Sequence, residues 1–231
     1  LEPIALIGHD EVLTRGVSGN AYVYSINDST NEKINNITNI AAQILREVLQ
    51  SNNITYIELI DVRIGLEGIE ILGKVLEDNK LITAIRLCDN DIGFEELSLL
   101  IELLENNHSL INIDIEYNNI GVQGLIILDE FLKNNNTIKK ICLNNNIIGD
   151  VGIVQLVKAL ETNRTINQIY LSYNNITDNG AITLVGLLES NNKITSKIII
   201  EFTDFDNENI NYQVEELLIE TLESHNKKQG V

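Results

Sequence analysis

The sequence predicts an α/β solenoid built from stacked strand–turn–helix units. One observation is a fixed step: isoleucines stand at positions 64, 92, 120, 148 and 176, each 28 residues after the one before. A second is that Gly65, Gly93, Gly121 and Gly149 follow the first four of these isoleucines, and Thr177 follows the fifth. Self-similarity at a period of 20 to 50 residues is typical of repeat proteins, in which each unit buries its apolar face against its neighbours.

Each unit opens with a short strand in which two apolar residues alternate with other residues. Alternation with period two sends the apolar pair to one face of a sheet and the residues between them to the other. The predicted inward pairs are Ile57 and Leu59, Ile85 and Leu87, Ile113 and Ile115, Ile141 and Leu143, and Ile169 and Leu171.

Each unit closes with an amphipathic helix whose apolar residues are spaced by three, three and one. Helices need more width than strands. We therefore expect a horseshoe with parallel strands on its concave face and helices on its convex face. The predicted helix core comprises Ile69, Leu72, Val75, Leu76, Leu97, Leu100, Leu103, Leu104, Leu125, Leu128, Phe131, Leu132, Ile153, Leu156, Ala159, Leu160, Ala181, Leu184, Leu187 and Leu188.

Asparagines recur at two places in each unit, after the strand and at the end of the helix. Asn90, Asn118, Asn146 and Asn174 recur at the step of 28, with Val62 in the first place. Stacked in a column, their amides can bind backbone groups that lose their partners where each strand ends. The glycine after each isoleucine is expected to allow a tight turn, and Thr177 to cap its helix instead.

The helix ends carry a second set of asparagines, for example Asn106-Asn107 and Asn134-Asn135. We expect these residues to close the helices in the left-handed conformation, which asparagine tolerates.

The ends of the chain depart from the period. We predict an N-terminal cap over residues 1–38, repeats over 39–192, and a C-terminal capping repeat with tail over 193–231. In the first segment, Ala21–Ile26 is expected to form a strand with Ile4–Ile7 near it. In the last, we expect a helix over Tyr212–Ser224 and a frayed tail from His225 onward.

Composition limits the function. The formal net charge is −18, which argues against nucleic acid as a partner and suits a basic protein partner or simple solubility. The repeat places Cys88 and Cys142 too far apart for a disulfide, so we predict free thiols in a reducing compartment. No segment has the roughly 20 apolar residues of a membrane-spanning helix, and we predict a cytoplasmic location without membrane association.

One family resemblance follows from these residues. The unit Ile138-x-x-Ile141-x-Leu143-x-x-Asn146-x-Ile148-Gly149, continued by Gly152, Leu156 and Leu160, resembles the leucine-rich repeat. The 28-residue period and the G-x-x-G helix entry resemble its ribonuclease-inhibitor-like class, over about Asn39 to Leu222. The resemblance implies a protein-binding horseshoe. Proteins of this kind include cytosolic immune receptors, inhibitors, activators of small GTPases and eukaryotic-like effectors of intracellular bacteria.

The predicted binding surface is the concave face. Aromatic residues are 5% of the chain, yet several fall on this face, and tyrosine and arginine are common among the residues that dominate binding energy. The alternative is that these tyrosines only cover neighbouring apolar surface. Acidic residues in the first half suit a basic partner segment. The predicted partner-binding residues are Tyr56, Glu58, Arg86, Asp89, Asp114, Glu116, Tyr117, Tyr170, Tyr173 and Phe202.

We predict no enzyme activity, cofactor or metal. His9, His108 and His225 have neither cysteine partners nor metal-ligand spacing, and Asp114 and Glu116 lie on an open face unsuited to acid–base chemistry. The leading hypothesis is a non-catalytic protein-binding module, either acting in its own cytoplasm or secreted as an effector into a host cell. The alternatives are a GTPase activator of the Ran-activating type and a structural arm of a larger protein.

Overall fold

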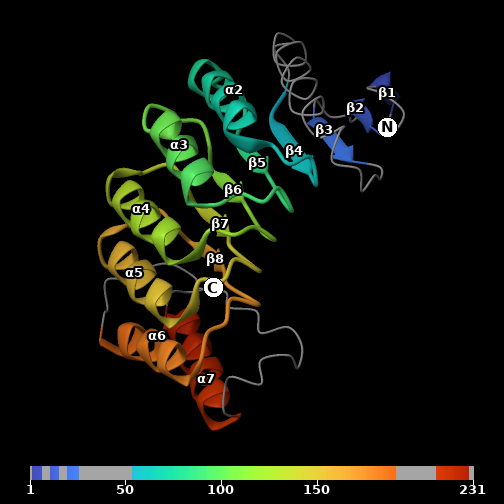
Figure 1. Ribbon diagram of the computed structural model, residues 1–231. Coiled ribbons are helices and arrows are strands. Elements are labelled where there is room, and N and C mark those ends of the chain that lie inside the picture. The colour runs from blue at the N-terminus through green and yellow to red at the C-terminus, as the bar shows by residue number, and fades with distance from the viewer. Residues whose placement is uncertain (1, 7–10, 16–19, 26–53, 191–211, 229–231) are drawn as a thin grey trace. The chain divides into compact units, whose positions relative to one another are not determined.

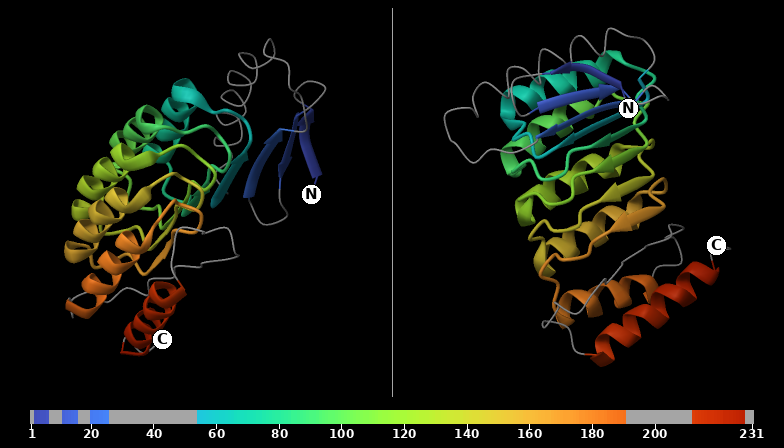
Figure 2. Two further views of the ribbon diagram at one scale, coloured as in Figure 1. Left: turned by 60° about the horizontal axis from the view of Figure 1, so that its bottom comes forward. Right: turned by 90° about the vertical axis from the view of Figure 1, so that its right-hand side faces the viewer.

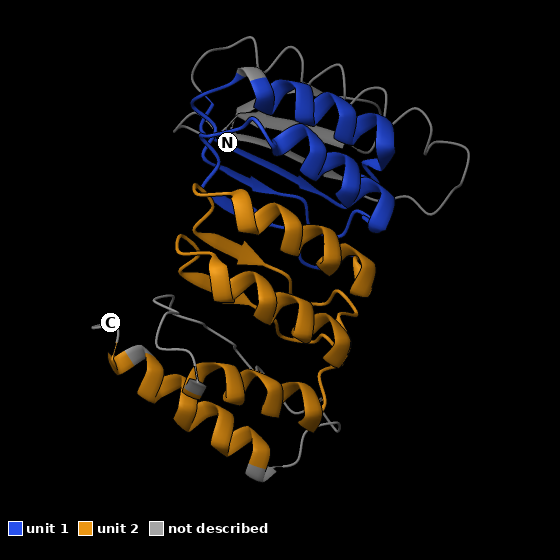
Figure 3. Ribbon diagram, turned by 90° about the vertical axis from the view of Figure 1, so that its left-hand side faces the viewer, with its two compact units in different colours: residues 1–118 blue, residues 119–231 orange. Residues whose placement is uncertain are grey.

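The computed structural model describes residues 2–6, 11–15, 20–25, 54–190 and 212–228. The chain divides into two compact units, Leu1–Asn118 (unit 1) and Asn119–Val231 (unit 2), which are coloured separately in Figure 3. The sequence also predicts an apolar helix face over Asn39–Gln50 in a degenerate first repeat, and this segment lies outside the described residues, as do residues 193–211 of the predicted C-terminal capping repeat.

Unit 1 combines an antiparallel edge with a parallel sheet. Strands β1 (Glu2–Leu6) and β3 (Asn20–Ser25) both pair with β2 (Glu11–Arg15) in antiparallel fashion. Strands β3, β4 (Tyr56–Ile60), β5 (Ala84–Arg86) and β6 (Asn112–Asp114) then follow in parallel. Helices α2 (Gly65–Asp78) and α3 (Phe94–Leu104) lie side by side on one face of β4–β6 (Figures 1 and 2). The strands predicted near Ile4 and Ala21 are therefore present, but the strand between them was not predicted.

Unit 2 repeats the same alternation. Helix α4 (Gly121–Asn134) precedes β7 (Lys140–Cys142), helix α5 (Gly149–Thr162) precedes β8 (Gln168–Tyr170), and α6 (Asp178–Ser190) follows. Strands β7 and β8 are parallel, and the three helices pack in series. Helix α7 (Tyr212–Lys228) packs against α6 (Figure 1). Both units are therefore α/β, with parallel strands that alternate with helices.

The predicted apolar positions form the core. All ten inward strand residues are at most 5% exposed, as the period-two pattern requires. The helix positions are also buried, except that Val75 and Leu103 are only half-buried. The repeat pattern therefore predicts which side chains leave water, and their burial is the main favourable contribution to folding.

The turn asparagines form the predicted column. Asn118 is buried, and its Oδ1 accepts hydrogen bonds from the backbone N–H groups of Asn90 (3.1 Å) and Ile92 (2.9 Å). Its Nδ2 donates to the carbonyl oxygen of Leu87 at 2.8 Å. In unit 2, Asn174 accepts from the backbone N–H of Asn146 at 2.8 Å. Each amide thus satisfies backbone groups of the preceding repeat, and the prediction is confirmed.

The asparagines at the helix ends do not adopt the predicted left-handed conformation. Asn79, Asn135 and Asn163 have φ values of −85°, −79° and −69°, with extended ψ. Their side chains instead accept hydrogen bonds from the two backbone N–H groups that lead into the next strand, as Asn163 does from Thr165 and Ile166 at 2.8 Å. Asn163 also donates to the carbonyl oxygen of Leu132 at 2.7 Å. The side-chain turn, rather than a left-handed cap, satisfies these helix ends.

The entries into the helices follow the prediction in most repeats. Gly65, Gly121 and Gly149 have φ values of +54°, +60° and +61°, a conformation that favours glycine. Gly93 instead has a φ of −100°. Thr177 caps α6, because its Oγ1 accepts from the backbone N–H of Asn179 at 3.3 Å.

Helix α7 is longer than predicted. It continues past Ser224 to Lys228, and His225, expected in a frayed tail, is 6% exposed. Leu218 and Leu222 are buried on the same helix. The spacing of 218, 222 and 225 places all three on one face, so packing extends the helix by one turn. None of the helices within these described stretches is long and apolar enough to cross a membrane. The predicted domain boundaries and the predicted horseshoe, with its concave and convex faces, stay predictions.

We predict that Asn118→Ala destabilises the protein by about 3 kcal/mol, because two buried backbone donors lose their acceptor. Urea unfolding checks this value. The exposed neighbour Asn119 is the matched control, and Asn119→Ala should change the free energy of unfolding by less than about 0.5 kcal/mol. Equal effects of the two substitutions would contradict a structural role for the column.

We also predict that Asp129→Val stabilises the protein. Asp129 in α4 is buried, with Oδ2 bonded to Lys133 Nζ at 2.8 Å and Oδ1 without a hydrogen-bond partner. Valines occupy the equivalent positions 157 and 185 of α5 and α6. An apolar replacement should add about 1 kcal/mol, since the partly exposed Lys133 can return to water. Thermal unfolding measures the change, with Asp129→Asn as the polar control, and a less stable Asp129→Val protein would refute the account.

Candidate functional site

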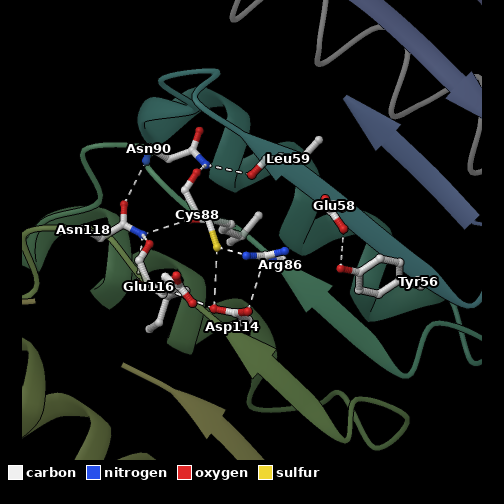
Figure 4. A network of polar contacts seen from close by, with 11 residues as sticks. Tyr56, Glu58, Leu59, Arg86, Cys88, Asn90, Asp114, Glu116 and Asn118 are labelled. Carbon is white, nitrogen blue, oxygen red and sulfur yellow. Dashed lines mark hydrogen bonds and ion pairs between the residues drawn. The ribbon is translucent and has the colours of Figure 1, made fainter. Parts of the chain in front are cut away.

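The strand surface of unit 1, opposite the helices, carries a row of charged residues. Glu58, Arg86 and Asp114 are in register on β4, β5 and β6. Arg86 Nε lies 3.2 Å from Asp114 Oδ2 and donates to Cys88 Sγ at 3.0 Å (Figure 4). The guanidinium therefore neutralises part of the acidic charge within the row.

Tyr56 and Glu58 are tied to each other. The Tyr56 hydroxyl donates to Glu58 Oε2 at 2.6 Å, and Glu58 is only 8% exposed (Figure 4). Burial, reinforced by the Glu58 carboxylate, raises the pKa of Tyr56. Both residues were predicted to bind a partner. The structure places them together, with their polar atoms engaged inside the protein.

Cys88 is a neutral, protected thiol. It is 3% exposed, and burial together with the nearby Asp114 carboxylate raises the pKa of the thiol to about 12, although Arg86 opposes the shift. The thiolate is the nucleophilic form of cysteine, so Cys88 is not reactive at neutral pH. Cys88 and Cys142 are both buried and free, as predicted.

One cluster of potential metal ligands lies beside this row. Cys88, Asp114 and Glu116 each offer a ligand atom within 4.8 Å of the other two. However, Arg86 already donates to the thiol and pairs with Asp114. Because a guanidinium occupies the place of a cation and the thiol is neutral, we assign no metal to this cluster.

A second row lies where the strands of unit 1 turn toward the helices. It consists of Asp61, Asp89 and Tyr117, and we call it the turn row of unit 1. The backbone N–H of Asp61 donates to the carbonyl oxygen of Cys88 (3.1 Å), and that of Asp89 donates to the carbonyl oxygen of Glu116 (3.2 Å). The three turns are therefore adjacent, as neighbouring strands are, at about 4.8 Å per step.

All members of the row have a left-handed backbone. Their φ values are 53°, 54° and 54°, and the equivalent residues of unit 2, Asn145 and Tyr173, have 54° and 58°. Asparagine and aspartate tolerate this conformation, whereas a bulky side chain there costs on the order of 1 kcal/mol. Sequence reasoning placed both tyrosines on the surface but missed the backbone strain, which the alignment with Asn145 could have indicated.

The two strained tyrosines are also exposed. Tyr117 is 54% exposed and Tyr173 is 37% exposed. Their backbone conformation is costly. Tyr117 leaves about half of its surface in water, whereas Tyr173 buries the larger part of its surface, and that burial offsets some of the cost. The turn position of Tyr117 therefore carries an aromatic ring that burial within the chain explains least.

The strand surface of unit 2 has a different character. Lys140 Nζ lies 4.6 Å from the ring centroid of Tyr170, within the range of a cation–π contact. Of the predicted binding residues, Tyr170 and Tyr173 belong to unit 2, Phe202 lies outside the described residues, and the other seven belong to unit 1.

Comparisons with known proteins identify similar folds. No family model matches the chain, and no curated protein matches it. A solved structure named leiomodin-1 actin-binding site 2 matches with a TM-score of 0.53 at 17% identity, over 71% of this chain and 90% of that one. The tropomodulin C-terminal domain of Caenorhabditis elegans matches with a TM-score of 0.48 at 17% identity, over 83% of this chain and 94% of that one. At this identity the leiomodin-1 match indicates the fold alone.

The comparisons contradict the assignment to the ribonuclease-inhibitor-like class. The structure that matches with a TM-score above 0.5 is a leiomodin domain, and neither it nor any family model supports that class or a bacterial effector. The reason is physical: a 28-residue step measures the length of a strand–turn–helix unit. That length specifies an architecture, which proteins of different families can share.

The raised pKa of Cys88 predicts a loss of stability at alkaline pH. The unfolded thiol ionises near its ordinary pKa of about 9, whereas the folded thiol holds its proton to about 12. Above pH 9 the unfolded state therefore binds fewer protons, and the free energy of unfolding falls as pH rises. We expect Cys88→Ala to have a shallower decline between about pH 8 and 10.5, measured by urea unfolding at each pH. Identical slopes for both proteins would show that the thiol does not contribute.

Proposed function

We propose that this protein is a non-catalytic protein-binding module that uses the strand and turn surfaces of its two units. The observation that carries the proposal is the pair Tyr117 and Tyr173, exposed rings on a left-handed backbone. Asn145 occupies the equivalent position in another repeat, and asparagine suits that conformation better. A strained residue whose ring stays partly exposed to solvent is a reasonable candidate for function.

Tyrosine is well suited to binding a protein. Its ring supplies a large contact area with few rotatable bonds, and tyrosine is enriched among the residues that dominate binding energy. The absence of a reactive thiol at Cys88 and the internal pairing of Arg86 with Asp114 support a role without catalysis. We include a cytoplasmic location in the proposal, because the two free cysteines suit a reducing compartment.

Actin is the first partner to test. The name of the leiomodin-1 structure states that it is an actin-binding site, and its fold resembles that of this chain. No observation on this chain favours GTPase activation. A structural arm of a larger protein remains the competing hypothesis.

We predict that Tyr117→Asn raises the free energy of unfolding by up to about 1 kcal/mol, because it relieves backbone strain. Tyr173→Asn should raise it less, because the larger part of Tyr173 is buried. Both substitutions should weaken partner binding. Stability is measured by urea unfolding. Binding is measured first to monomeric and filamentous actin, and then by affinity capture from a eukaryotic lysate. The double variant Ile126→Gln/Ile182→Gln is the control, because it removes exposed apolar residues from helices α4 and α6.

Three outcomes are informative. A partner kept by the wild type and the helix control but lost by the tyrosine variants would support the proposed surface. A partner lost only by the helix control would refute it and move the site to the helices. No partner for the wild type, in actin or in lysate, would favour the structural arm.

A further inference from the structure

The turn row of unit 1 combines negative charge with an exposed aromatic ring. Asp61 and Asp89 are both exposed, and Tyr117 follows them on the next turn. Backbone hydrogen bonds join the three turns in order. At about 4.8 Å per strand, the row spans about 10 Å.

The charge on this row is not balanced within the described residues. Partial burial and then the neighbouring Asp89 carboxylate raise the pKa of Asp61, with Arg63 opposing the shift. Arg63 itself lies 3.9 Å from Asp91, which divides its charge between two partners. On the strand row, by contrast, Arg86 pairs directly with Asp114 at 3.2 Å. Like charges in the turn row therefore repel each other, and a cation from outside would relieve that repulsion.

We infer that the turn row of unit 1 binds an arginine or lysine side chain from a basic segment of a protein partner. The inference rests on the proposed function and adds the chemistry of the partner. The carboxylates of Asp61 and Asp89 would accept hydrogen bonds from the cation, and the ring of Tyr117 would attract it through its face.

The protein already contains this type of contact. In unit 2, Lys140 Nζ lies 4.6 Å from the centre of the Tyr170 ring. There the cation comes from the adjacent strand of the same sheet. In the turn row of unit 1, no described lysine or arginine makes such a contact with Tyr117, and about half of this residue's surface is exposed to solvent.

The test uses a hexa-arginine peptide as the probe, titrated into the full chain at low and at moderate salt. Asp61→Asn/Asp89→Asn removes two charges and keeps side chains that suit the left-handed backbone. We expect it to weaken peptide binding about five- to tenfold at low salt. Tyr117→Asn should weaken it about two- to fivefold without a change in charge.

The matched control is Glu77→Gln/Glu102→Gln. It also removes two negative charges, but from exposed positions on helices α2 and α3. Its effect should stay within about twofold, the size expected for a change in net charge alone. Urea unfolding of every variant shows that binding is compared between folded proteins.

Two results would overturn the inference. Equal weakening by the aspartate pair and the glutamate pair would mean that the peptide is attracted only by overall charge. If Tyr117→Asn bound the peptide as tightly as the wild type, the ring of Tyr117 would not be part of the binding site. Neither result would refute the proposed function, which fails only if the tyrosine variants retain the captured partner or the wild type captures none.

Discussion

The column of buried asparagine amides is the interaction on which both units depend. A strand of three residues leaves backbone donors and acceptors without partners at its end, and burying them unpaired would cost more than the strand contributes. In unit 1 the amide of Asn118 binds groups of the repeat before it, and in unit 2 the amide of Asn174 does the same. The repeats are therefore linked by side chains as well as by the sheet. A second set of asparagines at the helix ends links successive helices in the same way, as Asn107 and Asn163 do.

This arrangement determines where the proposed binding surface can lie. The residue before each column position, including the one that Val62 occupies, has a left-handed backbone conformation. Aspartate and asparagine fill this position in three turns and tyrosine in two. The backbone conformation at this turn position is therefore fixed, whereas the type of side chain varies. Of the residues found there, tyrosine is the type that a left-handed backbone favours least.

Much of the architecture could be predicted from sequence because the repeats are alike. Ile85 and Leu87 were identified as core by alternation, and Asn90 and Asn118 as a column by their common step. The helix-end asparagines were predicted in the wrong conformation, because Asn163 can act as a left-handed cap or as a side-chain turn. The choice depends on the Leu132 carbonyl in the preceding repeat. The hydrogen bond between Tyr56 and Glu58 could not be predicted either, because it depends on the side-chain positions on β4. The assignment to the ribonuclease-inhibitor-like class was wrong because repeat spacing reflects the geometry of a unit and does not distinguish between families that share that geometry.

The division between a fixed backbone and a free side chain has a consequence for how such a protein can change. The shape of each turn is held by the amide of the next asparagine, so the residue that faces solvent can be exchanged without rebuilding the fold. If the turns bind a partner as proposed, affinity would change one turn at a time, because each substitution alters a solvent-facing side chain while the scaffold persists. A chain with these turns would be a practical starting point for engineering binders, in which new side chains are grafted at the five left-handed positions described here.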